Sequence, residues 1–372
     1  MTRPAMGVIF ANMHDETLPS ITRNRTMASL PVAARYRMID FQLSAMTNAH
    51  IETIGVIVKQ NYRSLMDHLG NGRPWDLSRK LGGLTIFPPQ SELASGDDYV
   101  GRLGALYSIL PYLENSRAEY VVMADCDFIC TPDYEKILEF HEANRADVTM
   151  VCRQVPAGQP LPPENVTVRC GEDGLVTTLL SDDTTSGDHI QCMNMFVLSR
   201  RLLIEFIHSG HSHRQNHFVR DILMNHTDAI RTYAYLYEDY AAQIFNIRSY
   251  FEANRDLLQV KNLRRLFDCE PIYTKVRDEA PTRYAMDARA SECLIADGCI
   301  LEGTVENSIL FRGVRVRPGA VVRNCVLMQG TVVEENACLD SVITDKNVTV
   351  TAGRSVSGSL QYPVYVEKNV RV

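Results

Sequence analysis

Apolar runs of strand length alternate with helical patterns through the first two thirds of the chain. The pattern predicts buried strands at 6–11, 54–58, 120–125 and 146–155, and helices at 38–49, 61–69 and 133–145. Such alternation is typical of a parallel sheet with helices on its faces, in which ligands bind beyond the carboxyl ends of the strands. The turn after residue 11 and the segment 125–127 are therefore expected to carry any chemistry.

The C-terminal part has a different pattern, with short apolar pairs separated by Gly, Asn and Asp. A shift of 17 residues aligns 307–322 with 324–339 and 341–356. Apolar residues then coincide in three sets: Ile309, Val326 and Ile343; Val316, Val333 and Val350; Val322, Leu339 and Val356. A fixed period in register is the mark of a solenoid, and about three units of six residues predicts a parallel β-helix. The alternative is an antiparallel sheet with chance spacing.

These two patterns divide the chain into three parts. We expect an α/β domain at 1–240, a connecting segment at 241–290 and a β-helix domain at 291–372.

Composition narrows the class of protein. The 372 residues include 38 Lys and Arg against 45 Asp and Glu, a net charge of −7, with no basic run that would follow a nucleic acid backbone. No apolar stretch reaches the length of about 18 residues that a membrane helix needs, and no secretion signal is evident at the start. Ten cysteines lie mostly in apolar segments, which is typical of free buried thiols. We expect a cytoplasmic protein with neither nucleic acid nor membrane as a partner.

Three stretches resemble the bacterial ADP-glucose pyrophosphorylases, also called glucose-1-phosphate adenylyltransferases, and within them the GlgD-type subunits. They are PVAARYRMIDFQLSAMTNAHI (31–51), GRPWDL (72–77) and VENSILFRGVRV (305–316). The resemblance covers nearly the whole chain. It implies a Rossmann-like, GT-A-like nucleotidyltransferase domain followed by a left-handed parallel β-helix. The family makes ADP-glucose and pyrophosphate from ATP and glucose 1-phosphate for glycogen or starch synthesis.

The phosphate-binding loop of that family has lost its characteristic residues here. The family has LAGGxGxRL and a following KPA, because glycine backbones admit a triphosphate that Arg and Lys neutralise. This chain has FANMHDETL instead, and the resemblance places Asn12, Met13 and Asp15 at glycine positions, Thr17 at the arginine and Met27 at the lysine. Asp15 and Glu16 would also repel phosphate by several kcal/mol at an effective dielectric near 20. We expect a tight polar turn that does not bind ATP productively.

The resemblance also implies a metal site, since the family holds Mg²⁺ between two carboxylates. Asp127 in ADCDFIC keeps the first, whereas Gln243 stands at the second and Ala242 at a neighbouring arginine. In a strand, Asp125 points to the same face as Asp127 and could substitute for the lost carboxylate. Asp127 could equally be a solvated carboxylate at a strand end. We expect this chain to bind no cofactor, although the family uses Mg²⁺.

A sugar-phosphate contact is also altered. The family grips the phosphate with a lysine in an EKP segment, and Asp182 stands at that position. Residues 140–210 contain no lysine, so a small shift of the alignment restores none.

These losses predict a subunit that is inert alone and acts with a catalytic homologue, because phosphoryl transfer depends on positioning and charge neutralisation. A hetero-oligomer, as a tetramer, is the expected assembly, and a homo-oligomer is the alternative. The tail 362–372 would cover a coil edge or meet a partner. Two other functions stay open: an active adenylyltransferase with a remodelled loop, and a sugar-phosphate-binding or acyltransferase-like protein. The last would place a histidine between coils, and 291–372 has none.

Arg35 and Arg37 lie where the resemblance implies a contact to a phosphorylated sugar effector, and a guanidinium pair suits a phosphate. The alternative is an exposed pair bonded to Asp40 or another neighbour.

Overall fold

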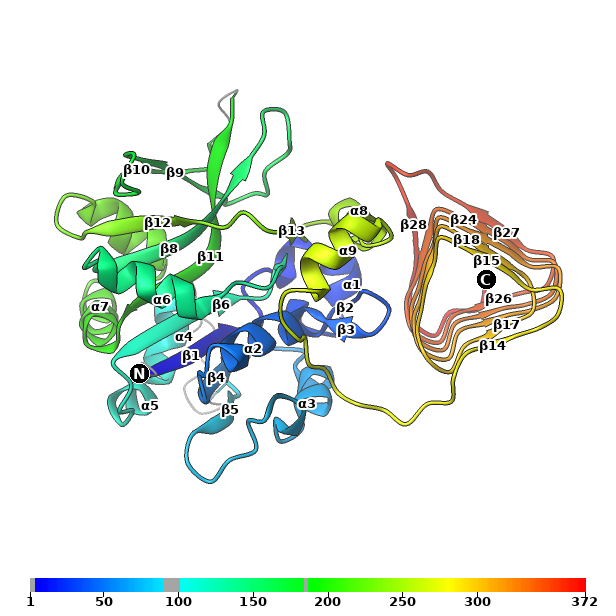
Figure 1. Cartoon of the computed structure of the whole chain (residues 1–372), viewed down its shortest axis with the longest axis horizontal. Coiled ribbons are helices and arrows are strands. Elements are labelled where there is room, and N and C mark those ends of the chain that lie inside the picture. The colour runs from blue at the N-terminus through cyan, green and yellow to red at the C-terminus, as the bar shows by residue number, and fades with distance from the viewer. Residues whose placement is uncertain (1–3, 90–100, 184–186) are drawn as a thin grey trace.

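The computed structural model describes residues 4–89, 101–183 and 187–372 and contains two domains (Figure 1). The N-terminal domain is built on a nine-stranded sheet in the order β10-β9-β11-β6-β1-β4-β5, with β8 paired to β11 and β12 paired to β8. Its strands are β1 (Ala5–Phe10), β4 (Thr53–Ile57), β5 (Gly83–Phe87), β6 (Tyr120–Asp125), β8 (Val148–Val155), β9 (Val166–Cys170), β10 (Val176–Ser181), β11 (His189–Ser199) and β12 (Thr232–Leu236).

The sheet is mixed, whereas the alternating pattern predicted a parallel one. β6, β1, β4 and β5 are parallel neighbours, and so are β8 and β12. β11 runs antiparallel to both β6 and β8. No helix separates β9, β10 and β11 in the described residues between them, and direct connections of this kind favour antiparallel pairing.

Helices cover both faces of the sheet, so its central strands are buried on both sides. They are α1 (Pro19–Thr22), α2 (Met38–Asn48), α3 (Arg63–Leu69), α4 (Gly101–Ser108), α5 (Leu110–Glu114), α6 (Tyr134–Ala143) and α7 (Arg200–Ser212). One core contains Phe41 of α2 and Ile9 of β1. The other contains Leu106 of α4, Leu203 of α7 and Val8 of β1. Alternate residues of β1 therefore enter different cores, as strand geometry requires. None of the helices in the described part of the chain is long and apolar enough to cross a membrane.

Much of the predicted connecting segment 241–290 has regular structure. β13 (Ala242–Gln243) pairs with β7 (Phe128–Ile129) of the first domain. α8 (Ile247–Asp256) and α9 (Val260–Phe267) then bury Phe251 and Leu266 in the first core. Residues 268–282 have neither helix nor strand.

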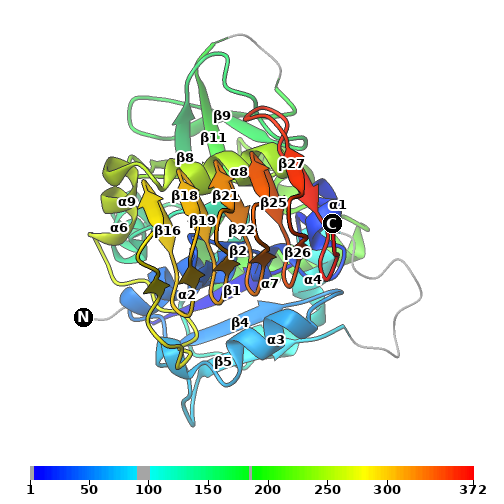
Figure 2. The ribbon, with the colours of Figure 1, turned by 90° about the vertical axis from the view of Figure 1, so that its right-hand side faces the viewer.

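The C-terminal domain is a parallel β-helix, seen nearly end-on in Figure 1 and from the side in Figure 2. Three five-stranded sheets form its walls, in the orders β14-β17-β20-β23-β26, β15-β18-β21-β24-β27 and β16-β19-β22-β25-β28. The first sheet consists of β14 (Arg283–Tyr284), β17 (Ile300–Leu301), β20 (Arg315–Val316), β23 (Val332–Val333) and β26 (Thr349–Val350). The second consists of β15 (Arg289–Ser291), β18 (Thr304–Glu306), β21 (Val321–Arg323), β24 (Cys338–Asp340) and β27 (Ser355–Ser357). The third consists of β16 (Leu294–Ile295), β19 (Ile309–Leu310), β22 (Val326–Leu327), β25 (Val342–Thr344) and β28 (Val364–Val366).

The predicted repeat is confirmed residue by residue. Ile309 pairs with Val326, and Val326 with Ile343. The other two aligned sets pair in the same way. The 17-residue shift is thus the length of one coil, although the coiling already begins at β14, before residue 291.

The two domains share a core and a buried ion pair. Ile309, Val326 and Ile343 of the third wall belong to the same apolar cluster as α2 and β1. Arg25 extends from the first domain and grips both carboxylate oxygens of Asp345 at 2.6 and 2.7 Å. Tyr365 donates to the same carboxylate at 2.8 Å. The β-helix is therefore fixed against the first domain by polar as well as apolar contacts.

Candidate functional site: a rebuilt nucleotide site

The loop after β1 is closed by its own side chains. Asp15 is buried and accepts hydrogen bonds from the Asn12 side chain and from the Met27 backbone N–H, the latter at 2.6 Å. Asn12 in turn accepts from Lys59 N at 2.8 Å, beyond the end of β4. Met27 is fully buried, and Thr17 donates within the loop to the carbonyl of His14 at 2.8 Å.

Asp15 is therefore bonded within the loop, and the expected repulsion of phosphate stays a prediction. The carboxylate points inward and holds the loop to residue 27, and Glu16 is the exposed acid of the pair. Burial raises the pKa of Asp15 to about 6, although its two hydrogen bonds oppose the shift.

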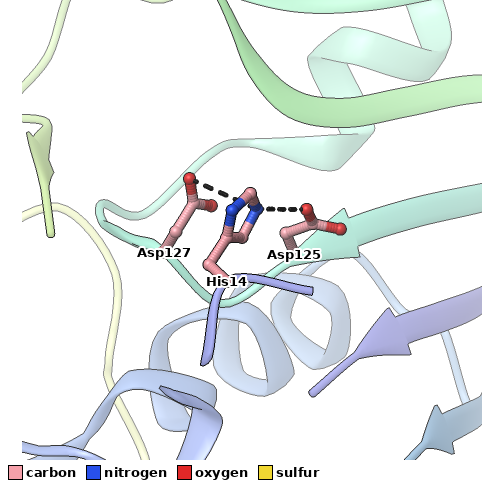
Figure 3. Close-up of side chains that lie close together, drawn as sticks. All are labelled: His14, Asp125 and Asp127. Atoms are coloured by element: carbon pink, nitrogen blue, oxygen red, sulfur yellow. Dashed lines mark hydrogen bonds and ion pairs between the residues drawn. The ribbon is translucent and has the colours of Figure 1, made fainter. Parts of the chain in front are cut away.

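A cluster of His14, Asp125 and Asp127 lies where β1 and β6 end, and we call it the carboxylate cluster (Figure 3). His14 Nε2 is 2.7 Å from Asp125 Oδ2 and 3.7 Å from Asp127 Oδ2. Both aspartates are fully buried. Asp125 ends β6 and Asp127 lies in the bend that follows, so this bend, and not the alternation of a strand, brings both carboxylates to His14.

Arg102, at the start of α4, binds Asp125 from the other side. Its Nε and Nη2 both donate to that carboxylate, the first at 3.2 Å. Its Nη2 also donates to Asn194 Oδ1 at 2.9 Å. This bidentate contact is the geometry in which arginine binds a carboxylate most strongly.

The pKa shifts follow from this arrangement. Burial alone would raise the pKa of Asp125, but the charges of Arg102 and His14 hold it below its usual value. Burial alone would lower the pKa of His14, but Asp127 and Asp125 raise it. Burial, aided by Asp125, keeps the pKa of Asp127 raised. Arg102 and His14 thus both favour the ionised form of Asp125.

Gln243 on β13 donates from Nε2 to Asp127 Oδ2 at 2.8 Å. Its Oε1 accepts from Gln191 Nε2 at 2.8 Å, and Gln191 Oε1 accepts from Arg153 Nε at 3.0 Å. Because arginine can only donate, this chain of bonds fixes the orientation of both amides. Gln243 therefore presents a donor to Asp127.

Comparison with known proteins agrees with this geometry. A nucleotidyl transferase family model matches residues 7–260, and a GlmU-like C-terminal hexapeptide model matches residues 278–361. The glycogen biosynthesis protein GlgD of Bacillus subtilis is 32% identical over 98% of this chain and 96% of its own length. GlgD of Geobacillus stearothermophilus is 35% identical over 87% of this chain and 84% of its own. The glucose-1-phosphate adenylyltransferase of the same organism is 31% identical over the same shares.

The chain belongs to the glucose-1-phosphate adenylyltransferase family.

This member of the adenylyltransferase family keeps Asp127, one of the two carboxylates that the family pattern implies for Mg²⁺, and has Gln243 in place of the other. Mg²⁺ requires oxygen ligands in near-octahedral geometry. Asn194 Nδ2 donates to Asp127 Oδ2 at 3.2 Å, so two amides turn their N–H groups, and not their oxygens, toward this carboxylate. The one free acceptor is Asp127 Oδ1, which is buried and has no hydrogen-bond partner among the described residues.

Asp182 lies away from the carboxylate cluster, on the turn after β10. It has a positive φ of 53° and accepts from the Glu164 backbone N–H at 2.6 Å. Its own N–H donates to Asn165. The aspartate therefore ties the end of β10 to the residues that precede β9.

Arg35 and Arg37 meet at a cavity between the two domains. Its basic lining residues are Arg35, Arg37, Lys275, Arg277, Arg312 and Lys346, and we call it the cationic cavity. Arg37 is buried and donates from Nη1 to Ser64 O at 2.7 Å, whereas Arg35 is exposed. Arg37 meets Asp40 through its backbone N–H, which donates to that carboxylate at 3.0 Å.

No acidic side chain is among the described residues that line the cationic cavity. Burial, with repulsion from Arg37 and Arg25, lowers the pKa of Lys346 to about 7. Burial, with repulsion from Arg35 and Arg277, also lowers the pKa of Arg312, whose Nε has no hydrogen-bond partner among the described residues. The cavity is thus poor in negative charge.

Sequence reasoning missed His14, Arg102 and Asn194. His14 lies inside the altered loop, where the sequence analysis considered only the lost glycines, Arg and Lys and not the imidazole between them. Arg102 and Asn194 reach the cluster from positions 23 and 67 residues away from their aspartate partners.

Proposed function

We propose that this chain is a GlgD-type subunit that does not convert ATP and glucose 1-phosphate itself. It acts in glycogen biosynthesis by assembling with a catalytic homologue and modulating it. The observation that carries the proposal is the carboxylate cluster, in which side-chain donors surround the aspartate that a catalytic metal would need. The similarity to two proteins named GlgD supports the same assignment. The cytoplasmic location expected from the sequence stays a prediction.

We expect the purified chain to turn over ATP and glucose 1-phosphate at a negligible rate. Loss of a single contact that stabilises transition-state charge typically costs about 10²–10³ in rate. The phosphate loop and the metal position are both altered here, so the rate should lie more than about 10³-fold below that of a catalytic homologue assayed in parallel.

The control for this assay is Asp127→Asn. Residual activity that the variant leaves unchanged comes from contamination. A turnover of about 1 s⁻¹ or more that Asp127→Asn abolishes would establish an active enzyme with a remodelled loop instead.

For assembly we expect a stable complex with the catalytic homologue, with a heterotetramer as the predicted form. Leu360 and Tyr362, 45% and 78% exposed, lie just before β28 at the last coil of the β-helix and suit a partner surface. Light scattering after size exclusion of the co-expressed chains measures the mass, and kinetics measure the modulation.

Leu360→Ser/Tyr362→Ser should weaken this complex and leave the fold intact. Deleting the whole tail is a poorer test, because β28 pairs with β25 and Val366 is buried. Leu81→Ser is the matched control, since Leu81 is 91% exposed on the first domain. The proposal would be excluded if an excess of this chain changed neither the mass nor the kinetics of the catalytic homologue.

We also propose that the cationic cavity binds a phosphorylated effector in the assembled protein. Six basic side chains with no acid among the described lining residues, and an unpartnered Arg312 Nε, support this role. A dianion there would relieve the repulsion among the basic groups.

A further inference from the structure

Four side chains contact Asp125 and Asp127 where the family would hold a metal, and of the four carboxylate oxygens Asp127 Oδ1 has no partner among the described residues. Arg102 and His14 contact Asp125. Asn194 and Gln243 contact Asp127. All four present N–H groups in this arrangement, provided that His14 is protonated at Nε2. We call these four residues the donor shell.

We infer that the donor shell is a built-in substitute for the divalent cation of this family, with the Arg102 guanidinium and three further N–H donors bound to the two carboxylates. This inference deepens the proposed loss of catalysis and rests on it.

Charge balance supports the substitution. Two buried carboxylates placed within 4.8 Å of a common histidine need compensation, which a divalent ion would supply. Arg102 supplies one such charge from within the chain, through two N–H groups that donate to Asp125. A divalent ion added to this set would lie against the Arg102 guanidinium and would have to take Asp125 from it.

The fixed orientations of the Gln243 and Asn194 side-chain amides support the substitution independently. Gln243 cannot turn its oxygen toward Asp127 without breaking its bond to Gln191, whose own orientation Arg153 fixes. Asn194 cannot turn without losing its bond from Arg102. The donor shell is therefore held by a second layer of hydrogen bonds, and no single rotamer change converts it into a set of metal ligands.

The substitution also joins segments that a bound metal nucleotide would otherwise connect. His14 comes from the loop after β1, and Asp125 and Asp127 from the end of β6. Arg102 comes from α4, Asn194 from β11 and Gln243 from β13. Elements of the first domain thus meet in one network that needs no ligand.

The test measures metal binding, using Mn²⁺ as the probe because its oxygen ligands are those of Mg²⁺. Electron paramagnetic resonance and calorimetry on the full wild-type chain should show no stoichiometric Mn²⁺ binding up to about 1 mM. Arg102→Met/Gln243→Asp removes the arginine and supplies a second family carboxylate. This variant should bind one Mn²⁺ per chain at least tenfold more tightly than the wild type.

Two single variants, His14→Gln and His68→Gln, distinguish the donor shell from a metal site that includes His14. A wild-type chain that binds one Mn²⁺ or Zn²⁺ and loses it in His14→Gln, but not in His68→Gln, would overturn the inference. His68 is the matched control because it also pairs with a buried aspartate, Asp40, at 2.6 Å. A folded double variant that binds no Mn²⁺ would overturn it as well.

If the double variant does not fold, Mn²⁺ binding by the single variant Gln243→Asp tests the inference, because this variant keeps Arg102. The inference requires that this variant binds no Mn²⁺, and a bound ion would contradict it. Metal binding and turnover are separate measurements. A wild-type chain that binds no metal yet catalyses the reaction would refute the proposed function, whereas an inactive chain that binds Mn²⁺ at His14 would refute only the donor shell.

Discussion

Asp345→Asn is expected to destabilise the protein by about 3–5 kcal/mol, because it removes one partner of a buried ion pair. Arg25 and Asp345 are each only 4% exposed, and Arg25 grips both carboxylate oxygens. The substitution leaves a guanidinium desolvated without its counter-charge. Calorimetry of the full chain should show a lower unfolding temperature, and limited proteolysis should show a loosened contact between the domains.

The matched control is Glu306→Gln in the β-helix, which breaks an ion pair between Arg323 and Glu306 with side chains 52% and 43% exposed. Exposed pairs of this kind contribute about 0–1 kcal/mol. The double variant Arg25→Met/Asp345→Leu should recover much of the loss, since it leaves no buried charge. Equal destabilisation by Asp345→Asn and Glu306→Gln would contradict the expectation.

The sequence predicted the β-helix more fully than the sheet domain, for a physical reason. Each coil contacts only its neighbours, so a repeat of 17 residues fixes which residues pair, as Ile309 and Val326 show. The strands of the sheet domain are visible as apolar runs, but their direction depends on the connections. The antiparallel direction of β11 could not be read from its own residues.

Sequence reasoning predicted only those residues of the candidate site that stand at positions with an assigned role in the family pattern. That reasoning indicated Asp127 and Gln243, which the fold brings into contact. It could not indicate His14, because the family pattern LAGGxGxRL leaves that position open. The inward turn of Asp15 was missed for a similar reason, since its partner is a backbone N–H that leaves no trace in the pattern of residue types.

Sulfate is expected to bind the cationic cavity more tightly at pH 6 than at pH 8, and Lys346→Met should remove this difference. Burial and repulsion from neighbouring cations lower the pKa of Lys346 to about 7, so its amine changes from charged to neutral across that interval. Sulfate remains a dianion throughout, and a charge-assisted hydrogen bond contributes about 1.5–3 kcal/mol, or about tenfold or more in affinity. The charged and titratable groups near Lys346 or lining the cavity are Arg25, Arg35, Tyr36, Arg37, His68, Lys275, Arg277, Arg312, Asp345 and Lys368.

Burial lowers the pKa of His68 despite the charge of Asp40, and a pH dependence that persists in Lys346→Met would assign the change to this imidazole instead. Lys275 is the matched control, because it lies 3.5 Å from the carboxylate of Asp67. Lys275→Met should weaken sulfate binding at both pH values and keep their ratio. Arg35→Ala tests the proposed effector contact, and an unchanged response to sulfate and to phosphorylated sugars in the assembled protein would remove Arg35 from that role.

The pH dependence of protein stability gives an independent measurement of the pKa of Lys346. The pKa of Lys346 is about 7 in the folded protein and 10.5 in its unperturbed state, so between these values the unfolded chain binds more protons. The free energy of unfolding of the native chain, relative to Lys346→Met, should therefore rise with pH from about 7 to 10, by up to a few kcal/mol. Denaturant titrations of both proteins across that range measure the difference. A flat difference, together with sulfate affinity that is equal at pH 6 and pH 8, would show that Lys346 stays charged and that the cavity does not depress its pKa.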